Sequence, residues 1–112
     1  MSKYQTLNEI TIDSSALINN YNYFQKLNPN CELCPVLKSN AYGHGLLPVA
    51  RIVDTKLKAP YLMVDSLYEA YELSKQKIRT PIMIMGYTNP QNYAIWKKLP
   101  YTLPGDEKVF NW

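Results

Sequence analysis

Short, unbroken apolar runs, separated by segments with helical spacing, constrain the fold of this chain more than any other feature of its sequence. The clearest runs are Cys34–Leu37, Pro60–Val64 and Pro81–Met85. A strand with one face in water alternates apolar and polar residues, whereas a strand covered on both faces reads as a continuous apolar run. The pattern therefore predicts an α/β fold with a parallel sheet and helices outside it, either doubly wound or a (β/α)8 barrel.

The segments between these runs carry the spacing and end signals of helices. Asp13 is a good N-cap for a helix whose apolar residues recur as far as Leu27. Ser66 and Glu69 have the form of a capping box at the start of another helix. Further helices are predicted over Leu46–Leu57 and from Asn89 through Leu99, and short strands over Ile10–Ile12 and Tyr101–Leu103.

Composition limits the broad class of the protein. A length of 112 residues indicates one domain at most, and 46% hydrophobic residues exclude wholesale disorder. The sequence has no apolar stretch long enough to span a bilayer, and Met1–Gln5 does not begin a secretory signal. A net charge of +3 is too small and too scattered to indicate nucleic acid. We therefore expect a cytoplasmic protein with no membrane and no nucleic-acid partner.

The two cysteines, Cys31 and Cys34, are spaced C-x-x-C in a segment that reads as extended. A zinc site needs more ligands than these two and the single histidine, His44, can supply. Residues three apart on a strand also point to opposite faces, so the two thiols should not meet. We expect two structural thiols in a reducing compartment and no metal.

Chemistry is indicated directly after the first apolar run, where Lys38 opens the segment Lys38–Gly45. The carboxyl end of a parallel strand is where α/β folds bind ligands. A lysine in apolar surroundings becomes a nucleophilic amine for carbonyl compounds. Gly43 and Gly45 would let backbone N–H groups approach an anion, and a helix N-terminus is expected at Leu46. These parts suit a carbonyl-bearing phosphate ligand, although a lysine at a strand end is more often simply solvated.

The segment Lys38–Gly45, with the sequence KSNAYGHG, closely resembles the pyridoxal-phosphate lysine motif of bacterial alanine racemases. Leu62–Val64 followed by Glu69-Ala70 and Leu73 is similar to the second strand and following helix of that family. Pro81–Gly86 looks like the third strand, and the resemblance covers roughly residues 7–103. The sequence departs from the family pattern at three positions, Ser39, Asp65 and Ser74, of which Asp65 places a carboxylate near the mouth of the site.

The resemblance implies a fold, an activity and a set of site residues. Residues 1–103 would form a partial pyridoxal-phosphate-binding barrel domain, the first βα units of a (β/α)8 barrel, and residues 104–112 an unassigned tail. Lys38 would be the catalytic residue, holding pyridoxal 5'-phosphate as an internal aldimine and acting as acid and base. Tyr42 would contact the phosphate, and Val36 and Met85 would pack around the cofactor. The complete enzyme would be a homodimer that interconverts L-alanine and D-alanine for peptidoglycan synthesis.

Two other interpretations remain open at this stage. The chain could come from a racemase of another amino acid on the same barrel, such as serine or a diamino acid. It could also be a truncated product without catalysis, and we expect the isolated chain to be inactive. Three other polar residues receive structural roles: His44 as a turn residue, Asn40 as a residue that orients the loop, and Glu69 as a helix cap.

Overall fold

The computed structural model describes residues 3–99 and 102–104 of the chain. Its strands are each three residues long and are spread through the C-terminal half, whereas its longest helix comes first. The helices are α1 (Ser14–Leu27), α2 (Lys38–Tyr42), α3 (Leu46–Lys56), α4 (Leu67–Ser74) and α5 (Tyr93–Trp96), with a 3-10 turn η1 (Pro90–Asn92); the strands are β1 (Leu62–Val64), β2 (Ile82–Ile84) and β3 (Thr102–Pro104).

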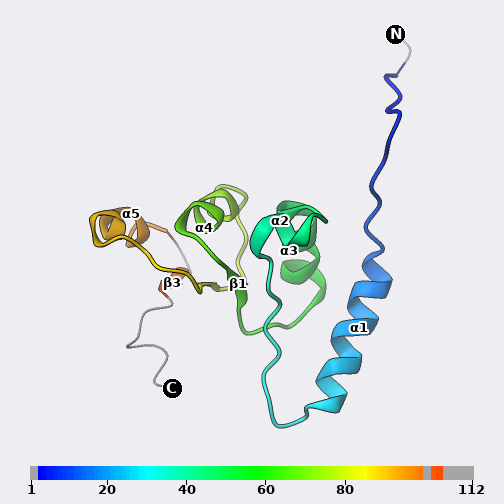
Figure 1. Ribbon diagram of the computed structural model, residues 1–112. Coiled ribbons are helices and arrows are strands. Elements are labelled where there is room, and N and C mark those ends of the chain that lie inside the picture. The colour runs from blue at the N-terminus through cyan, green and yellow to red at the C-terminus, as the bar shows by residue number, and fades with distance from the viewer. Residues whose placement is uncertain (1–2, 100–101, 105–112) are drawn as a thin grey trace.

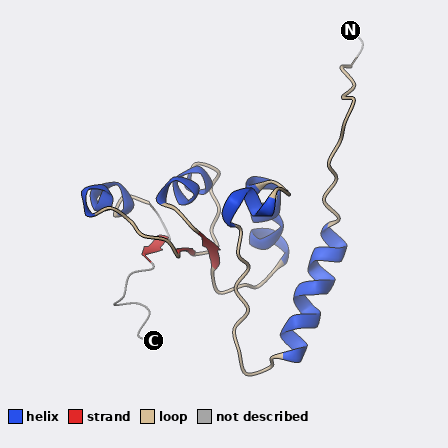
Figure 2. Cartoon of the chain, viewed as in Figure 1, coloured by secondary structure: helices blue, strands red, loops and turns tan. Residues whose placement is uncertain are grey.

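The strands form one parallel sheet in the order β1-β2-β3. Leu62 of β1 pairs with Ile82 of β2, which in turn pairs with Thr102 of β3. The helices α3, α4 and α5 lie in a row on one side of these strands, and α1 lies beyond α3 (Figures 1 and 2), with Leu17, Ile18 and Tyr21 packed against the core. Every residue of β2 is buried, as the unbroken apolar run predicted. The predicted α/β fold with a parallel sheet is confirmed.

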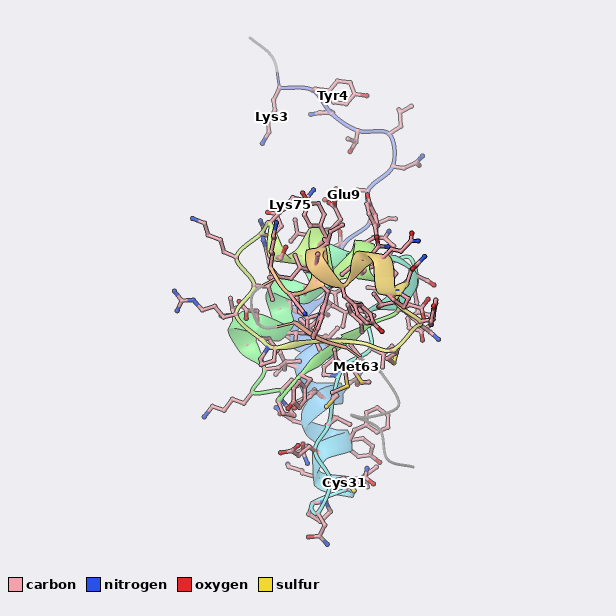
Figure 3. All side chains as sticks on the ribbon, turned by 90° about the vertical axis from the view of Figure 1, so that its left-hand side faces the viewer. Lys3, Tyr4, Glu9, Cys31, Met63 and Lys75 are labelled. Carbon is pink, nitrogen blue, oxygen red and sulfur yellow. The ribbon has the colours of Figure 1, made fainter. Side chains whose placement is uncertain are left out.

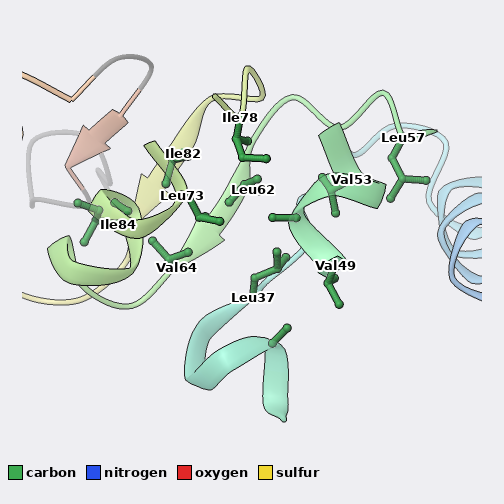
Figure 4. Packing of buried hydrophobic residues seen from close by; sticks show 13 residues of the cluster. Leu37, Val49, Val53, Leu57, Leu62, Val64, Leu73, Ile78, Ile82 and Ile84 are labelled. Carbon is green, nitrogen blue, oxygen red and sulfur yellow. The ribbon is translucent and has the colours of Figure 1, made fainter. Parts of the chain in front are cut away.

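The core lies between the strands and the helices that follow them. Val49, Ala50 and Val53 of α3 are buried, in agreement with the predicted apolar face of that helix. From α4, Ala70 and Leu73 are buried against the same cluster. Figure 4 shows Leu37, just before α2, between β1 and α3. This packing fixes the point at which the chain leaves the sheet and enters α2.

The predicted strand over Cys34–Leu37 is reduced to a single parallel bridge between Val36 and Met63. Two backbone hydrogen bonds make this bridge: the Leu37 N–H donates to the Met63 carbonyl at 2.7 Å, and the Met63 N–H donates to the Pro35 carbonyl at 2.8 Å. Pro35 has no N–H with which to extend the pairing. The segment nevertheless runs parallel to β1, so the carboxyl ends of both lie at one edge of the sheet.

The predicted strand over Ile10–Ile12 is wrong, because this segment pairs with no described strand and Ile10 is 78% exposed. Figure 3 shows Lys3 and Tyr4 on the same N-terminal stretch, well away from the body of the molecule. Three residues of apolar alternation carry no information on whether a neighbouring strand is present. The helix that follows begins as predicted, with the Asp13 carboxylate accepting the Ala16 N–H at 3.0 Å.

The predicted helix from Asn89 through Leu99 is divided into η1 and α5, and it ends earlier than expected. Its start is correct: the Asn89 side chain accepts the Gln91 N–H at 3.0 Å. At its end the Leu99 N–H donates to the Trp96 carbonyl at 2.9 Å, a tightened final turn. Of the predicted strand over Tyr101–Leu103, Tyr101 lies outside the described residues, as does most of the predicted tail, 105–112. Across the described part of the chain, no helix combines the length and apolarity needed to cross a bilayer.

Candidate functional site

Lys38 lies where the chain leaves the bridge with β1, at the carboxyl-end edge of the sheet. Leu37, the residue before it, is only 1% exposed and anchors this point in the core. Lys38 itself is half-buried, and its ammonium has no hydrogen-bond or ion-pair partner within residues 3–99 and 102–104. The lysine therefore combines a fixed backbone with a side chain that is available to a ligand.

The residues that follow Lys38 form a turn of left-handed helix. Ser39, Asn40, Ala41 and Tyr42 have φ values of 53°, 56°, 53° and 55°. For L-residues other than glycine, this conformation costs roughly 1–2 kcal/mol per residue. Asparagine tolerates it better than alanine or tyrosine. The sequence predicted a polar, glycine-bearing turn here, but it did not predict four consecutive residues of this hand.

Contacts within the loop hold part of this turn. The Asn40 carbonyl accepts the Gly45 N–H at 2.9 Å, and its side-chain Oδ1 accepts the Leu46 N–H at 2.8 Å at the start of α3. Ala41 is 4% exposed and donates its N–H to the Leu37 carbonyl at 2.9 Å. These bonds connect both ends of the turn to the core and to α3.

A carboxylate from α4 holds the start of the turn. Glu69 Oε1 accepts the Ser39 N–H at 2.9 Å, while Oε2 accepts the N–H groups of Asp65 at 2.8 Å and Ser66 at 3.0 Å. The Ser66 hydroxyl accepts the Glu69 N–H at 3.2 Å, which completes the predicted capping box. The sequence identified the cap but not the contact with Ser39, because the capping signal is local and Ser39 lies 30 positions earlier.

The ends of β1 and β2 approach each other closely at the same edge. The Gly86 N–H donates to the Asp65 carbonyl at 2.9 Å, and a Cβ at residue 86 would lie only 2.3 Å from that oxygen. Met85 is half-buried beside this contact and donates its N–H to the Val64 carbonyl at 2.8 Å. Glycine is therefore required at position 86 by space rather than by a positive φ.

The structure brings some of the predicted site residues together and separates others. Val36 and Tyr42 line one cleft of about 570 Å³ between α1 and the first βα unit, together with His44. Tyr42 is 62% exposed, and its hydroxyl has no described partner. Lys38 adjoins this cleft in the chain without lining it, and Met85 lies two strand positions away along the sheet edge.

The cysteines make no disulfide, and Cys34 lines the same cleft as Val36 and Tyr42. Cys31 is exposed, and Figure 3 shows it at the end of the molecule beyond α1. Burial, together with the nearby Glu32 carboxylate, raises the pKa of the Cys34 thiol and so lowers its thiolate content. The described residues also contain no group of three or more metal-ligating side chains.

Comparison with known proteins gives consistent matches. Residues 12–104 match the family model of the N-terminal domain of alanine racemase. The alanine racemase of Staphylococcus saprophyticus is 36% identical over 105 residues, which are 91% of this chain and 27% of that protein. An amino-acid racemase of Enterococcus faecalis is 38% identical over 82 residues, covering 72% of this chain and 11% of that protein.

A solved structure also matches. The crystal structure of alanine racemase from Oenococcus oeni superposes with a TM-score of 0.74 at 31% identity, over 81% of this chain and 25% of that one. The chain therefore spans about a quarter of the length of the alanine racemases that it matches.

Proposed function

This chain belongs to the alanine racemase family through its N-terminal domain, and on that premise we propose that it supplies the cofactor-binding lysine of a pyridoxal-phosphate-dependent alanine racemase. The reaction would interconvert L-alanine and D-alanine for peptidoglycan synthesis, in the cytoplasm, within a homodimer. Residues 1–103 would be the barrel portion of that enzyme. One observation carries the proposal: the half-buried Lys38, with an unpartnered ammonium, begins a left-handed turn at the carboxyl-end edge of a parallel sheet.

The predicted site residues carry functional groups that suit pyridoxal 5'-phosphate. Lys38 offers an amine to the cofactor aldehyde, and the exposed Tyr42 hydroxyl offers a hydrogen bond to the phosphate. Val36, at 37% exposure, presents an apolar surface in the same cleft as Tyr42, and Met85 offers another on β2's side. When bound, the cofactor withdraws electrons from the Cα of an attached amino acid and makes its proton acidic.

In this proposal the residues of the chain bind the cofactor and move one proton. Lys38 Nζ would bind the cofactor and, once released by the substrate amine, would take a proton from Cα or return one to it. Racemisation also needs a proton donor on the opposite face of Cα. We assign no described residue to that second role.

A reductive labelling experiment tests the assignment of Lys38. The chain is incubated with pyridoxal 5'-phosphate, treated with borohydride and mapped by peptide mass spectrometry. Label should be found on Lys38, because it is half-buried at the carboxyl-end edge with its backbone fixed beside Leu37, whereas Lys56 and Lys97 are exposed. Preferential label on Lys56 or Lys97 would contradict the assignment, and Lys38→Ala is the matched control.

The activity is tested in a complete enzyme. Residues 12–104, the segment matched by the family model, would replace the corresponding segment of the Staphylococcus saprophyticus alanine racemase. The hybrid should form D-alanine from L-alanine, and Lys38→Ala should abolish this activity.

The Enterococcus faecalis similarity supports a second candidate, a racemase of another amino acid. It is tested with a complete enzyme that carries this segment in its own chain, in which conversion of serine in preference to alanine would favour it.

A further inference from the structure

We propose that Glu69 is a positioning residue for Lys38, holding the left-handed turn that aims the lysine at its ligand. This inference rests on the proposed function in one respect only, that Lys38 is the residue that binds the cofactor. The observation behind it is independent of that assignment. One carboxylate on α4 accepts hydrogen bonds from the loops that follow both the Val36 bridge and β1.

Peptide geometry explains why the Ser39 contact matters for Lys38. The N–H of Ser39 belongs to the same planar peptide unit as the carbonyl of Lys38. Fixing that N–H at 2.9 Å from Glu69 Oε1 therefore fixes the peptide plane that adjoins the Lys38 Cα. The direction in which the lysine side chain leaves the sheet edge depends on that plane.

The turn needs such support because its own backbone is unfavourable. Ser39 is the first of its four residues with φ near +55°. At the start of a helical turn, N–H groups lack partners within the turn and need outside acceptors. A carboxylate is a strong acceptor for backbone N–H groups. Glu69 thus satisfies the Ser39 N–H at the point where the strained conformation begins.

Glu69 is held in place by the packing of α4 on the core and by the capping box at the start of that helix. The next residue, Ala70, is fully buried, and Leu73 is 1% exposed, so this face of α4 is docked on the core. The capping box holds the carboxylate from the N-terminal side of the helix. A displacement of α4 would therefore carry the Ser39 contact with it, which couples the shape of the lysine turn to the docking of this helix.

A substitution can separate the contact of Glu69 with Ser39 from its contacts with Asp65 and Ser66. In Glu69→Gln the amide keeps one acceptor oxygen and replaces the other with a donor. The remaining carbonyl oxygen should accept the N–H groups of Asp65 and Ser66, which belong to the same capping turn as residue 69. The Ser39 N–H should then lose its acceptor, because Ser39 lies 30 positions away on a separate loop. Asp54→Asn is the matched control, since the Asp54 carboxylate accepts the N–H groups of Arg79 and Thr80 at the opposite edge of the sheet.

The experiment measures amide exchange by NMR and borohydride labelling with pyridoxal 5'-phosphate on the full chain. In Glu69→Gln, the Ser39 amide should exchange about 10- to 100-fold faster than in the wild type, while the Ile82–Ile84 amides keep their protection. Labelling of Lys38 should fall about tenfold, the change expected from losing one such bond. Asp54→Asn should leave both readouts unchanged. Glu69→Asp, whose shorter side chain reaches the local N–H groups but not Ser39, should behave like Glu69→Gln.

The outcomes distinguish this inference from the proposed function. If wild-type Lys38 is labelled, and Glu69→Gln keeps Ser39 protected or keeps the wild-type labelling rate, the positioning role is overturned and the proposed function stands. If Asp54→Asn lowers Lys38 labelling as much as Glu69→Gln does, the effect is general destabilisation and the positioning role is also overturned. If wild-type Lys38 is not labelled, the proposed function fails, and the role of Glu69 toward the cofactor fails with it.

Discussion

At each edge of the small sheet a carboxylate accepts backbone N–H groups, but the backbone that it holds differs between the two edges. At the carboxyl-end edge, the Glu69 carboxylate accepts N–H groups from Ser39, Asp65 and Ser66. At the amino-end edge, the Asp54 carboxylate accepts the N–H groups of Arg79 and Thr80 and the Thr80 hydroxyl, just before β2. Arg79 and Thr80 do not have a positive φ, whereas Ser39 begins a left-handed turn. The Asp54 carboxylate stabilises relaxed backbone, and the Glu69 carboxylate holds an unfavourable backbone shape beside Lys38.

This difference agrees with a general property of parallel α/β folds, in which the carboxyl-end edge carries function and the amino-end edge carries stability. Substitutions of side chains at the carboxyl-end edge should therefore affect the site, with a loss of stability only where they disturb the backbone, whereas substitutions at the amino-end edge should affect the free energy of unfolding alone.

The largest effect is expected for Gly86→Ala, which places a methyl group against backbone at the carboxyl-end edge. The new Cβ would lie 2.3 Å from the Asp65 carbonyl oxygen, so the ends of β1 and β2 must separate. We expect the free energy of unfolding to fall by about 3 kcal/mol in urea titrations. Gly43→Ala is the control, because a Cβ there meets nothing within 4 Å and only the positive φ opposes it. Equal losses in the two variants would show that contact with Asp65 is not the cause.

Asp54→Ala, at the amino-end edge, should lower stability without changing the site. Thr80 is 8% exposed, so its N–H and hydroxyl would lose their acceptor in a buried place. We expect a loss of about 2 kcal/mol in the free energy of unfolding, measured by urea denaturation. Reductive labelling of Lys38, measured without denaturant, should not change. A change in the labelled residue would mean that the two edges are not independent.

Tyr42→Phe should give the reverse result, with binding weakened and stability retained. The Tyr42 hydroxyl has no described partner, and the residue is 62% exposed, so its removal should hardly change unfolding. Loss of one hydrogen bond to the phosphate should weaken cofactor binding by about 1.5 kcal/mol in titrations of the complete hybrid enzyme. Equal affinity in the two proteins would show that Tyr42 serves only in packing.

Ser66→Ala should produce the smallest effect and tests the cap of α4 alone. The Ser66 hydroxyl accepts the Glu69 N–H, and losing an N-cap costs about 1 kcal/mol. Thermal unfolding should record this loss, while the Ser39 amide keeps the exchange rate of the wild type. Faster exchange at Ser39 would show that Glu69 depends on its own cap to reach the lysine turn.

Patterns that depend on burial and on neighbours in sequence were predictable. The unbroken apolar runs over Pro60–Val64 and Pro81–Met85 predicted parallel strands correctly, because burial on both faces removes alternation. The start of α4 followed from Ser66 and Glu69, which satisfy each other across one helical turn. The location of Lys38 at a sheet edge followed from its place after an apolar run.

Features decided by distant contacts were not predictable. Nothing in Ala41 or Tyr42 favours a positive φ, so the hand of the turn depends on Asn40, α3 and Glu69. The segment Ile10–Ile12 has the pattern of a strand but no described partner. The roles of Lys38, Tyr42, Val36 and Met85 remain predictions until the labelling and binding experiments are made.

The distance along the chain between Ser39 and Glu69 also bears on the order of folding. A contact that spans 30 positions requires a long loop to close, whereas right-handed helix and turn form locally within microseconds. The residues after Lys38 gain this acceptor only when α4 has formed and docked against the sheet. We therefore expect the Ser39 N–H to gain its acceptor only after α4 has docked, so the start of the lysine turn should become protected later than α4 in a folding experiment that follows amide exchange.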